Sequence, residues 1–237
     1  MLEEEMKKEQ RKFTKKLDIS KKNLEGHLNL NDFVNLEELD CSFNRLDRLD
    51  FEGCSNLKKI NCSNNIVLSE IKLPFDGKKL EKINLENNNL SEQGLSCFEN
   101  FTRLKKLNIG NYEFGVQVPK KPATENEKGW KARKTIAKVM AWAREEKIEE
   151  DKYNRFHGSL KPLKKLTELE SLDISSTDID EGLEYLPKSL KSFKCFNSKR
   201  PQSKVQKIYG ELFIYGGKIK NWQEANPEKM NNVWGEN

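Results

Sequence analysis

The sequence predicts an α/β solenoid, a horseshoe with a parallel β-sheet on its concave face, short helical or irregular segments on its convex face, and one inserted helix. The first observation is a phrase in which apolar residues stand at positions one, four and six and an Asn follows three residues later, as from Leu36 to Asn44. The second is that the phrase begins again at Leu57 and at Leu80, a period of roughly 20–25 residues that is typical of repeat architectures. Each unit would add one layer to a continuous core.

The copies of this phrase can be followed along the chain from its first to its last third. The first copy, which begins near Leu17, carries Lys22 where the Asn would stand. Three good copies follow, and a further one opens at Leu104 but loses the pattern at Asn111. Two more begin at Leu169 and at residue 190. We therefore expect seven units, with degenerate first and last units that act as caps.

Each unit is expected to contain one short strand whose side chains alternate between the core and the concave surface. In the unit that begins at Leu36, Leu39 and Cys41 point inward and Asp40 points outward. The Asn that follows, Asn44 in this unit, turns inward and bonds backbone groups that the bend would leave unpaired. The return segments carry apolar residues at a spacing that indicates short helical turns, as at Leu95, Phe98 and Phe101.

A segment of different composition interrupts the repeats between Phe114 and Phe156. Thr124 with Glu127 three residues later is a capping-box signal for the start of a helix. The apolar residues after it recur at helical spacing and predict a helix over roughly residues 125–150: Trp130, Ile136, Val139, Met140, Ala143 and Ile148. This helix either docks on the solenoid, which would cover its apolar stripe, or presents that stripe to a partner.

These features divide the chain into five parts. They are an N-terminal capping helix, the first repeats, the helical insertion, the continued repeats, and a C-terminal cap and tail: residues 1–12, 13–114, 115–155, 156–200 and 201–237. In the cap, Val205, Ile208, Tyr209 and Leu212 indicate a closing helix that ends near Gly216. The residues after it are rich in Asn, Glu and Pro, and we expect them to be partly disordered.

The composition fits an elongated protein with a large surface. Of the 237 residues, 34% are charged and 35% are hydrophobic, the mean hydropathy is −0.86, and the net charge is +5. No apolar run reaches the roughly 18 residues of a membrane-spanning helix, and the first residues lack the apolar region of a secretory signal. The cysteine count, five, is odd and favours buried thiols over a disulfide framework. We therefore expect a cytoplasmic location.

The repeats resemble those of leucine-rich-repeat proteins over about residues 13 to 200. The residues of the repeats also resemble those of a large intracellular fungal group of such proteins, in which Cys-Ser-x-Asn units are common. The segments that carry this resemblance are LDISKKNLEG and GSLKPLKKLTELESLDISSTDIDEGLEYLPKSLKSF. The resemblance implies a horseshoe used for protein binding. Repeats of that group sometimes accompany protein-kinase domains, but this chain contains no Gly-rich phosphate loop, His-Arg-Asp or Asp-Phe-Gly, so no kinase function transfers.

The outward residues of the concave face are the candidate binding site for a protein partner. Their charge alternates between units, which favours a mixed-charge protein over a uniform polyanion, and Phe43 and Phe196 add aromatic side chains at exposed strand positions. Ion pairing between strands, serving solubility alone, is the simpler interpretation of the same pattern. The candidate contact residues are Asp40, Phe43, Lys58, Lys59, Asn61, Asn64, Lys82, Asn84, Glu86, Lys105, Lys106, Asn108 and Asp173.

A second hypothesis rests on two clusters of basic residues, one in the insertion and one before the C-terminal cap. Such clusters hold nucleic acid or an anionic membrane surface through phosphate contacts. The candidate residues are Lys131, Arg133, Lys134, Lys191, Lys194, Lys199 and Arg200. A solvated basic end of the solenoid would have the same composition, and no recognised nucleic-acid motif accompanies the clusters.

We expect neither a catalytic site nor a metal site. The two histidines, His27 and His157, stand in different segments, and no Cys/His cluster has the spacing of metal ligands. The outward Asp and Asn residues of the strands are more simply the polar surface of the concave face than an acid–base pair. The sequence thus predicts a monomeric, non-catalytic interaction or scaffold module without a cofactor, for which signalling is one setting.

Overall fold

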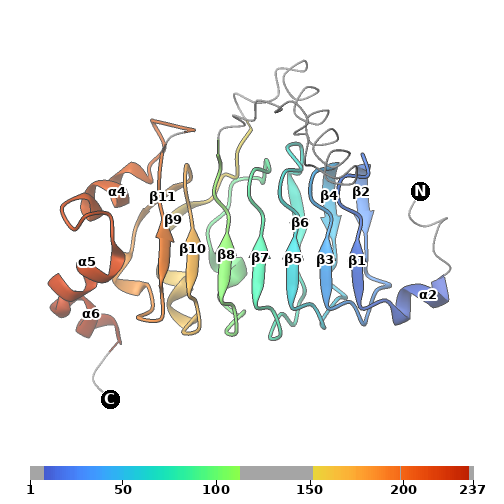
Figure 1. The fold of residues 1–237 in the computed structure, drawn as a ribbon, viewed down its shortest axis with the longest axis horizontal. Helices are drawn as coiled ribbons and strands as arrows, with labels where there is room; N and C mark the ends of the chain where they lie inside the picture. Colours follow the sequence, from blue (N-terminus) through green and yellow to red (C-terminus); the bar gives the residue numbers. More distant parts are fainter. Residues whose placement is uncertain (1–7, 113–151, 198, 235–237) are drawn as a thin grey trace, which may run out of the picture.

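Seven parallel strands form the central sheet of the molecule. The computed structural model describes residues 8–112, 152–197 and 199–234. Neighbouring strands are hydrogen-bonded in chain order, and Figure 1 shows them side by side along the molecule. The strands are β1 (Lys16–Asp18), β3 (Glu38–Asp40), β5 (Lys59–Asn61), β7 (Lys82–Asn84), β8 (Lys106–Asn108), β10 (Ser171–Asp173) and β12 (Ser192–Lys194). They confirm the solenoid and its seven predicted units.

The core follows from the register of these strands. The middle residue of each strand is paired with the middle residue of the next, so that Leu39 lies between Leu17 and Ile60, and Leu172 lies between Leu107 and Phe193. Because strand side chains alternate, the whole middle row points to one side and forms one layer of the core. The first and third residues of each strand therefore face the opposite side, where the candidate contact residues were expected.

A ladder of buried asparagines, Asn44, Asn65 and Asn88, closes the turns after β3, β5 and β7, as the sequence predicted. The Asn44 side-chain amide donates to the carbonyls of Ile19 and Cys41, and its Oδ1 accepts from the backbone N–H of Leu24. Asn65 repeats this arrangement one layer further on. These bonds satisfy backbone groups that would otherwise be buried without a partner. The Asn residues are therefore structural.

The return segments contain the short 3₁₀ helices that the sequence indicated, and also strands that it did not. The helices are η1 (Ser96–Phe98), η2 (Lys161–Lys165) and η3 (Leu183–Tyr185). A parallel three-stranded sheet is built from β2 (Glu25–Asn29), β4 (Arg45–Asp50) and β6 (Glu70–Lys72), and a second pair from β9 (His157–Ser159) and β11 (Asp178–Glu181). These segments were missed because their apolar residues are too few to show alternation.

The interrupted repeat is completed from beyond the insertion. Asn111 ends the regular pattern, and the sequence placed the return to the repeats at residue 156. The structure shows that Asn154 already belongs to the solenoid: its side-chain amide donates to the carbonyls of Leu85 and Ile109, and its Oδ1 accepts from the N–H of Leu90. Asn154 thus takes the ladder position of this unit. The helix expected over residues 125–150 lies outside the described residues.

Helices lie at the two ends of the sheet (Figure 1). At the N-terminal end is α2 (Lys8–Phe13), and beyond β12 come α4 (Gln206–Phe213), α5 (Ile219–Ala225) and α6 (Pro227–Trp234). The expectation of a partly disordered tail after residue 216 is wrong for the residues of α5 and α6. These helices bury Trp222 and Met230 in the core. Within the described part of the chain, no helix is long and apolar enough to cross a membrane.

Candidate partner-binding groove

A groove lies over the exposed face of the seven-stranded sheet, with a volume of about 630 Å³. All seven strands contribute to its lining. Three rows of side chains run across the strands here, and we name them by position. The edge row contains the residues just before the strands, the lysine row contains the first strand residues, and the turn row contains the last strand residues.

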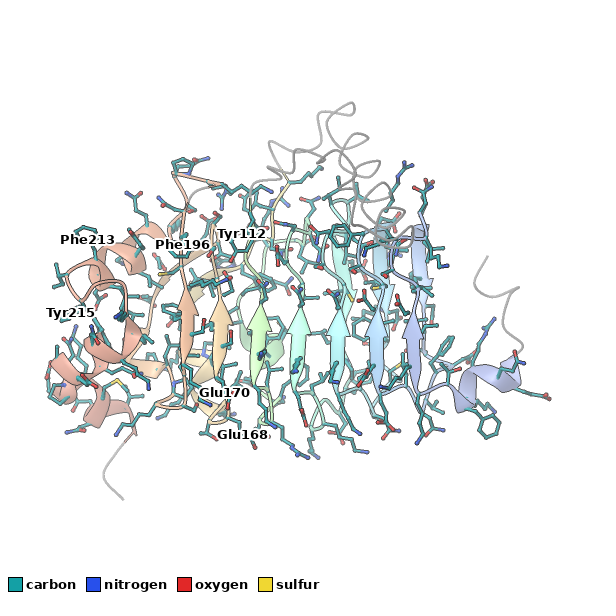
Figure 2. The ribbon with its side chains drawn as sticks, in the orientation of Figure 1. Tyr112, Glu168, Glu170, Phe196, Phe213 and Tyr215 are labelled. Carbon is teal, nitrogen blue, oxygen red and sulfur yellow. The ribbon has the colours of Figure 1, made fainter. Side chains whose placement is uncertain are left out.

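The edge row is a ladder of alternating charge: Lys15, Glu37, Lys58, Glu81, Lys105, Glu170 and Lys191. Lys58 Nζ lies 2.6 Å from a Glu37 carboxylate oxygen, and Lys191 Nζ lies 2.9 Å from Glu170. The hydrogen bond from Lys58 lowers the pKa of Glu37, and the bond from Lys191 lowers that of Glu170 in the same way. Figure 2 shows Glu170 at the lower end of β10, which is where the edge row lies. This row bears out ion pairing between strands.

The lysine row changes character along the groove: Lys16, Glu38, Lys59, Lys82, Lys106, Ser171 and Ser192. Glu38 binds the lysines on both sides, with Lys16 Nζ at 3.2 Å and Lys59 Nζ at 2.7 Å. The next two lysines, Lys82 and Lys106, are paired in register on β7 and β8. Neither of them forms an ion pair with any described residue. The middle of the groove therefore carries two lysines without a carboxylate within 4.0 Å among the described residues.

The turn row consists mainly of Asp and Asn residues, for a structural reason. Its members are Asp18, Asp40, Asn61, Asn84, Asn108, Asp173 and Lys194. In the first six, a side-chain oxygen accepts the backbone N–H two residues later, at 3.0–3.3 Å. Asp and Asn are the residues whose short side chains make this Asx turn. The expected polar surface is therefore also a set of turn caps. The Nδ2 of Asn84 makes no hydrogen bond with the described residues.

One end of the turn row forms an acidic corner at the top of β8 and β10. The Tyr112 hydroxyl donates to the Asp173 carboxylate, and Asn108 Nδ2 donates to Glu86 at 2.8 Å. Burial raises the pKa of Glu86, against the hydrogen bond from Asn108, and the charge of Asp173 raises it further. Burial and the bond to Asp173 also raise the pKa of Tyr112, which Figure 2 places above β8. Tyr112 was missed from the sequence because it stands where the repeat pattern stops.

Several expected contact residues are engaged within the solenoid itself. Asn64 is buried and accepts a bond from Asn87, and its positive φ of 60° places it in the turn rather than on the strand. Phe43 also has a positive φ, of 57°, and is half-buried beneath the Lys21 ammonium. Both residues occupy the left-handed position that precedes a ladder asparagine, so they lie in the turn and not on the strand. Their contact with a partner stays a prediction. Phe196 is 49% exposed, as expected.

Three lysines of the candidate site are also held by carboxylates. Lys58 and Lys59 bind Glu37 and Glu38, and Lys105 Nζ lies 3.8 Å from Glu81. The candidate contact residues of the groove floor nevertheless come together as predicted, since Lys59, Lys82 and Lys106 all line it with the turn row. Of the candidate lysines of the groove, Lys82 and Lys106 are the two without a carboxylate within 4.0 Å in the described part of the chain.

The four candidate basic residues before the C-terminal cap all have partners among the described residues. Lys191 binds Glu170, and Lys194 Nζ lies 3.8 Å from Asp173. Lys199 donates to the Lys152 carbonyl. Arg200 binds the Asp178 carboxylate at 3.2 Å, and its guanidinium stacks 3.5 Å from the centre of the Tyr153 ring. The other candidates of this hypothesis, Lys131, Arg133 and Lys134, lie outside the described residues.

The thiols and possible metal ligands give no second site. All five cysteines are unpaired. Burial raises the pKa of Cys54 and Cys195 to about 12, so both stay protonated at neutral pH. Over residues 8–112, 152–197 and 199–234, no three His, Cys, Asp or Glu side chains come together in a way that could hold a metal ion.

Comparison with known proteins bears on the repeats directly. Family models match at residues 34–74 (leucine-rich repeats, two copies) and at residues 79–101 (leucine-rich repeat). No curated protein matches the chain. The resemblance to a fungal group stays a prediction.

Three solved structures are similar to the chain at low sequence identity. An internalin (inlF) from Listeria monocytogenes str. 4b F2365 is 14% identical, with a TM-score of 0.41 over 79% of this chain and 49% of that one. A leucine-rich-repeat protein of Leptospira interrogans is 20% identical, with a TM-score of 0.41 over 78% and 41%. The functional domain of InlJ from Listeria monocytogenes is 16% identical, with a TM-score of 0.31 over 72% and 36%. The chain thus spans half or less of the length of these structures.

Proposed function

We propose that this chain, which is a leucine-rich-repeat protein, binds a protein partner in the groove over its seven-stranded sheet. Leucine-rich repeats commonly mediate protein–protein interactions, and solenoids use their extended concave surfaces for this purpose. The observation that carries the proposal is the groove itself, a hollow of about 630 Å³ to which residues of all seven strands contribute. The protein would act as a monomeric scaffold.

The side chains of the groove are held in place before a partner arrives. The edge row is fixed by ion pairs such as Lys58 with Glu37, and the turn row is fixed by Asx turns such as Asp40 with the Ser42 N–H. A surface whose side chains are already ordered loses less conformational entropy on binding. The mixed charges of these rows suit a protein surface, because opposite charges set the register of a partner.

The alternative, a nucleic acid or membrane held by basic residues, has less support. Lys191, Lys194, Lys199 and Arg200 all have partners within the chain. A polyanion held by these residues would have to displace these contacts. Binding of this kind would weaken steeply with salt, so salt dependence separates the two functions.

The proposal is tested by site-specific cross-linking in cells. A photo-reactive phenylalanine analogue replaces Ser171, which lines the groove, or Ser192, its partner in register on β12. As matched controls it replaces Asp47 of β4 or Glu181 of β11, both exposed on the return segments. We expect discrete protein adducts from the groove positions and none from the controls. Adducts from the return segments alone, or nucleic acid alone, would contradict groove binding.

The cellular compartment is a further part of the proposal. We infer that the protein works in the reducing cytoplasm, because its five unpaired cysteines include four that are buried and would be lost from the core if they were cross-linked. Alkylation during cell lysis, followed by mass spectrometry of the denatured chain, should find five labelled thiols. A disulfide-linked chain would contradict this location.

A further inference from the structure

We infer that the segment of the partner that enters the groove is acidic, and that its carboxylates bind at Lys82, Asn84 and Lys106. We call these three residues the central donor site. The inference rests on the proposed function, since it names the chemistry of the partner that the groove receives. It goes further because it assigns the contact to one place in the groove and to one kind of side chain.

The first step is the pairing of charge across the groove. In the edge, lysine and turn rows, seven lysines have a carboxylate within 4.0 Å: Lys15, Lys16, Lys58, Lys59, Lys105, Lys191 and Lys194. Among the described residues of these rows, Lys82 and Lys106 are the two that have none. The two lysines without a nearby carboxylate therefore lie side by side on β7 and β8, near the middle of the sheet.

The second step is the geometry of the open charges. Lys82 and Lys106 are partners in register on β7 and β8, and Lys59 is the partner of Lys82 on the other side. Neighbouring strands lie about 4.8 Å apart, so three ammonium groups start from adjacent positions and only one of them has a counter-ion. An incoming anion would relieve the repulsion between them and gain attraction at the same time.

The third step is the supply of hydrogen-bond donors beside these lysines. The Oδ1 of Asn84 accepts the Glu86 N–H, which leaves its Nδ2 pointing donors away from the turn. The equivalent amides have partners: Asn61 Nδ2 donates to Asp40 and Asn108 Nδ2 donates to Glu86. The centre of the groove thus offers ammonium and amide donors, which is the chemistry that recognises a carboxylate.

The fourth step decides between a short acidic segment and a long polyanion. Along the lysine and turn rows, the central donor site is followed by acids on both sides, Glu38 and Asp40 toward the first strand and Asp173 toward the last. A nucleic acid lying along the groove would place phosphates over these carboxylates. A protein segment can place carboxylates at the centre and neutral or basic side chains at the ends. The mixed pattern therefore favours an acidic segment within a protein.

The test measures binding of defined peptides to the full chain by fluorescence anisotropy. The probes are labelled twelve-residue Gly-Ser peptides that carry two Glu residues separated by one, two or three positions, the same peptides with Gln, and oligodeoxythymidylate of equal charge. The variant Lys82→Gln/Lys106→Gln removes the central charge, and Lys161→Gln/Lys165→Gln removes two exposed lysines of η2 as a matched control.

We expect at least one spacing of Glu to bind the wild type more tightly than its Gln counterpart, with affinity falling about tenfold, or 1.4 kcal/mol, in the central variant. The η2 variant should bind like the wild type. Equal binding of Glu and Gln peptides, equal loss in both variants, or tighter binding of the oligonucleotide would overturn the inference. Because these probes do not depend on a cellular partner, such a failure would leave the cross-linking test of groove binding untouched.

Discussion

At the scale of single residues, one buried side chain in each layer decides whether the turn after the strand can close. Asn154 illustrates this most directly, because it reaches its place from the far side of the insertion and still makes the bonds of Asn65. Its amide serves two carbonyls, and its oxygen serves one N–H. Alanine at this position would leave the Ile109 carbonyl and the Leu90 N–H without this partner, whereas the Leu85 carbonyl would keep its bond from Asn88.

Asn154→Ala should therefore lower the free energy of unfolding by about 2–4 kcal/mol, since each buried group left unpaired costs about 1–3 kcal/mol and partial relaxation recovers some of it. Asn100→Ala is the control, because Asn100 is exposed in a return segment. Urea unfolding followed by circular dichroism measures both. Equal midpoints for the two variants would show that Asn154 does not complete the ladder.

Glu86 is a second residue whose environment makes a prediction. Burial raises the pKa of its carboxyl, so ionisation costs more in the folded than in the unfolded protein. That cost is absent below the ordinary pKa of Glu and is fully present above the raised one. Glu86→Gln keeps an oxygen for the Asn108 bond and removes the cost.

We expect Glu86→Gln to raise the Tm at pH 7, and the difference from the wild type to vanish below pH of about 4. Thermal unfolding across this pH range measures the effect. If Glu86→Gln instead lowers the Tm at pH 7 relative to the wild type, ionised Glu86 does not destabilise the folded protein and the prediction is contradicted.

At the scale of elements, the strands of the sheet are linked by side chains as well as by backbone. Lys58 lies between Glu37 and Glu81 in the edge row, whereas Lys82 lies between Lys59 and Lys106 in the lysine row. The same charge reversal therefore has opposite consequences in the two rows, although both side chains lie at the exposed face of neighbouring units.

Lys58→Glu should lower the Tm, and the loss should shrink in high salt because the repulsion it creates is screened. Lys82→Glu should leave the Tm unchanged or raise it, because it places a negative charge between two lysines. Differential scanning calorimetry at low and high salt measures both variants. A larger loss from Lys82→Glu than from Lys58→Glu would contradict the charge pattern.

The element scale also shows what could be predicted from the sequence. The apolar period predicted each strand of the central sheet and the ladder asparagines Asn44, Asn65 and Asn88, because buried positions recur with a regular choice of residue type. It did not predict Asn154, which lies beyond the insertion. The groove floor followed from the same alternation. The roles of Asn64 and Phe43 did not follow, because a left-handed turn residue and an outward strand residue can have the same polarity.

At the scale of the whole molecule, the solenoid needs its ends closed because the last layer would otherwise expose its core. The helices α4, α5 and α6 do this at the C-terminal end. Trp222 is 1% exposed, and its indole N–H donates to Glu211 at 3.0 Å. The free energy of unfolding of the solenoid should therefore depend on these three helices, although they lie outside the repeats.

Trp222→Ala should cost about 3–5 kcal/mol, the usual loss for truncating a large buried aromatic residue. Phe213→Ala is the matched control, because Phe213 is in the neighbouring helix but is 66% exposed. Chemical denaturation of both variants measures the difference. If Phe213→Ala costs as much as Trp222→Ala, the cap is not held by the burial of Trp222.

The backbone N–H of Asn154 donates to the side chain of Asn111 at 2.8 Å, so the two ends of the insertion are fastened to each other. Joining the ends of a loop becomes costlier only slowly as the loop lengthens. The layer is therefore indifferent to how much chain passes between these two residues. Segments of very different length could therefore be exchanged between these two residues without shifting the register of the strands. The position is suited to the insertion of additional sequence.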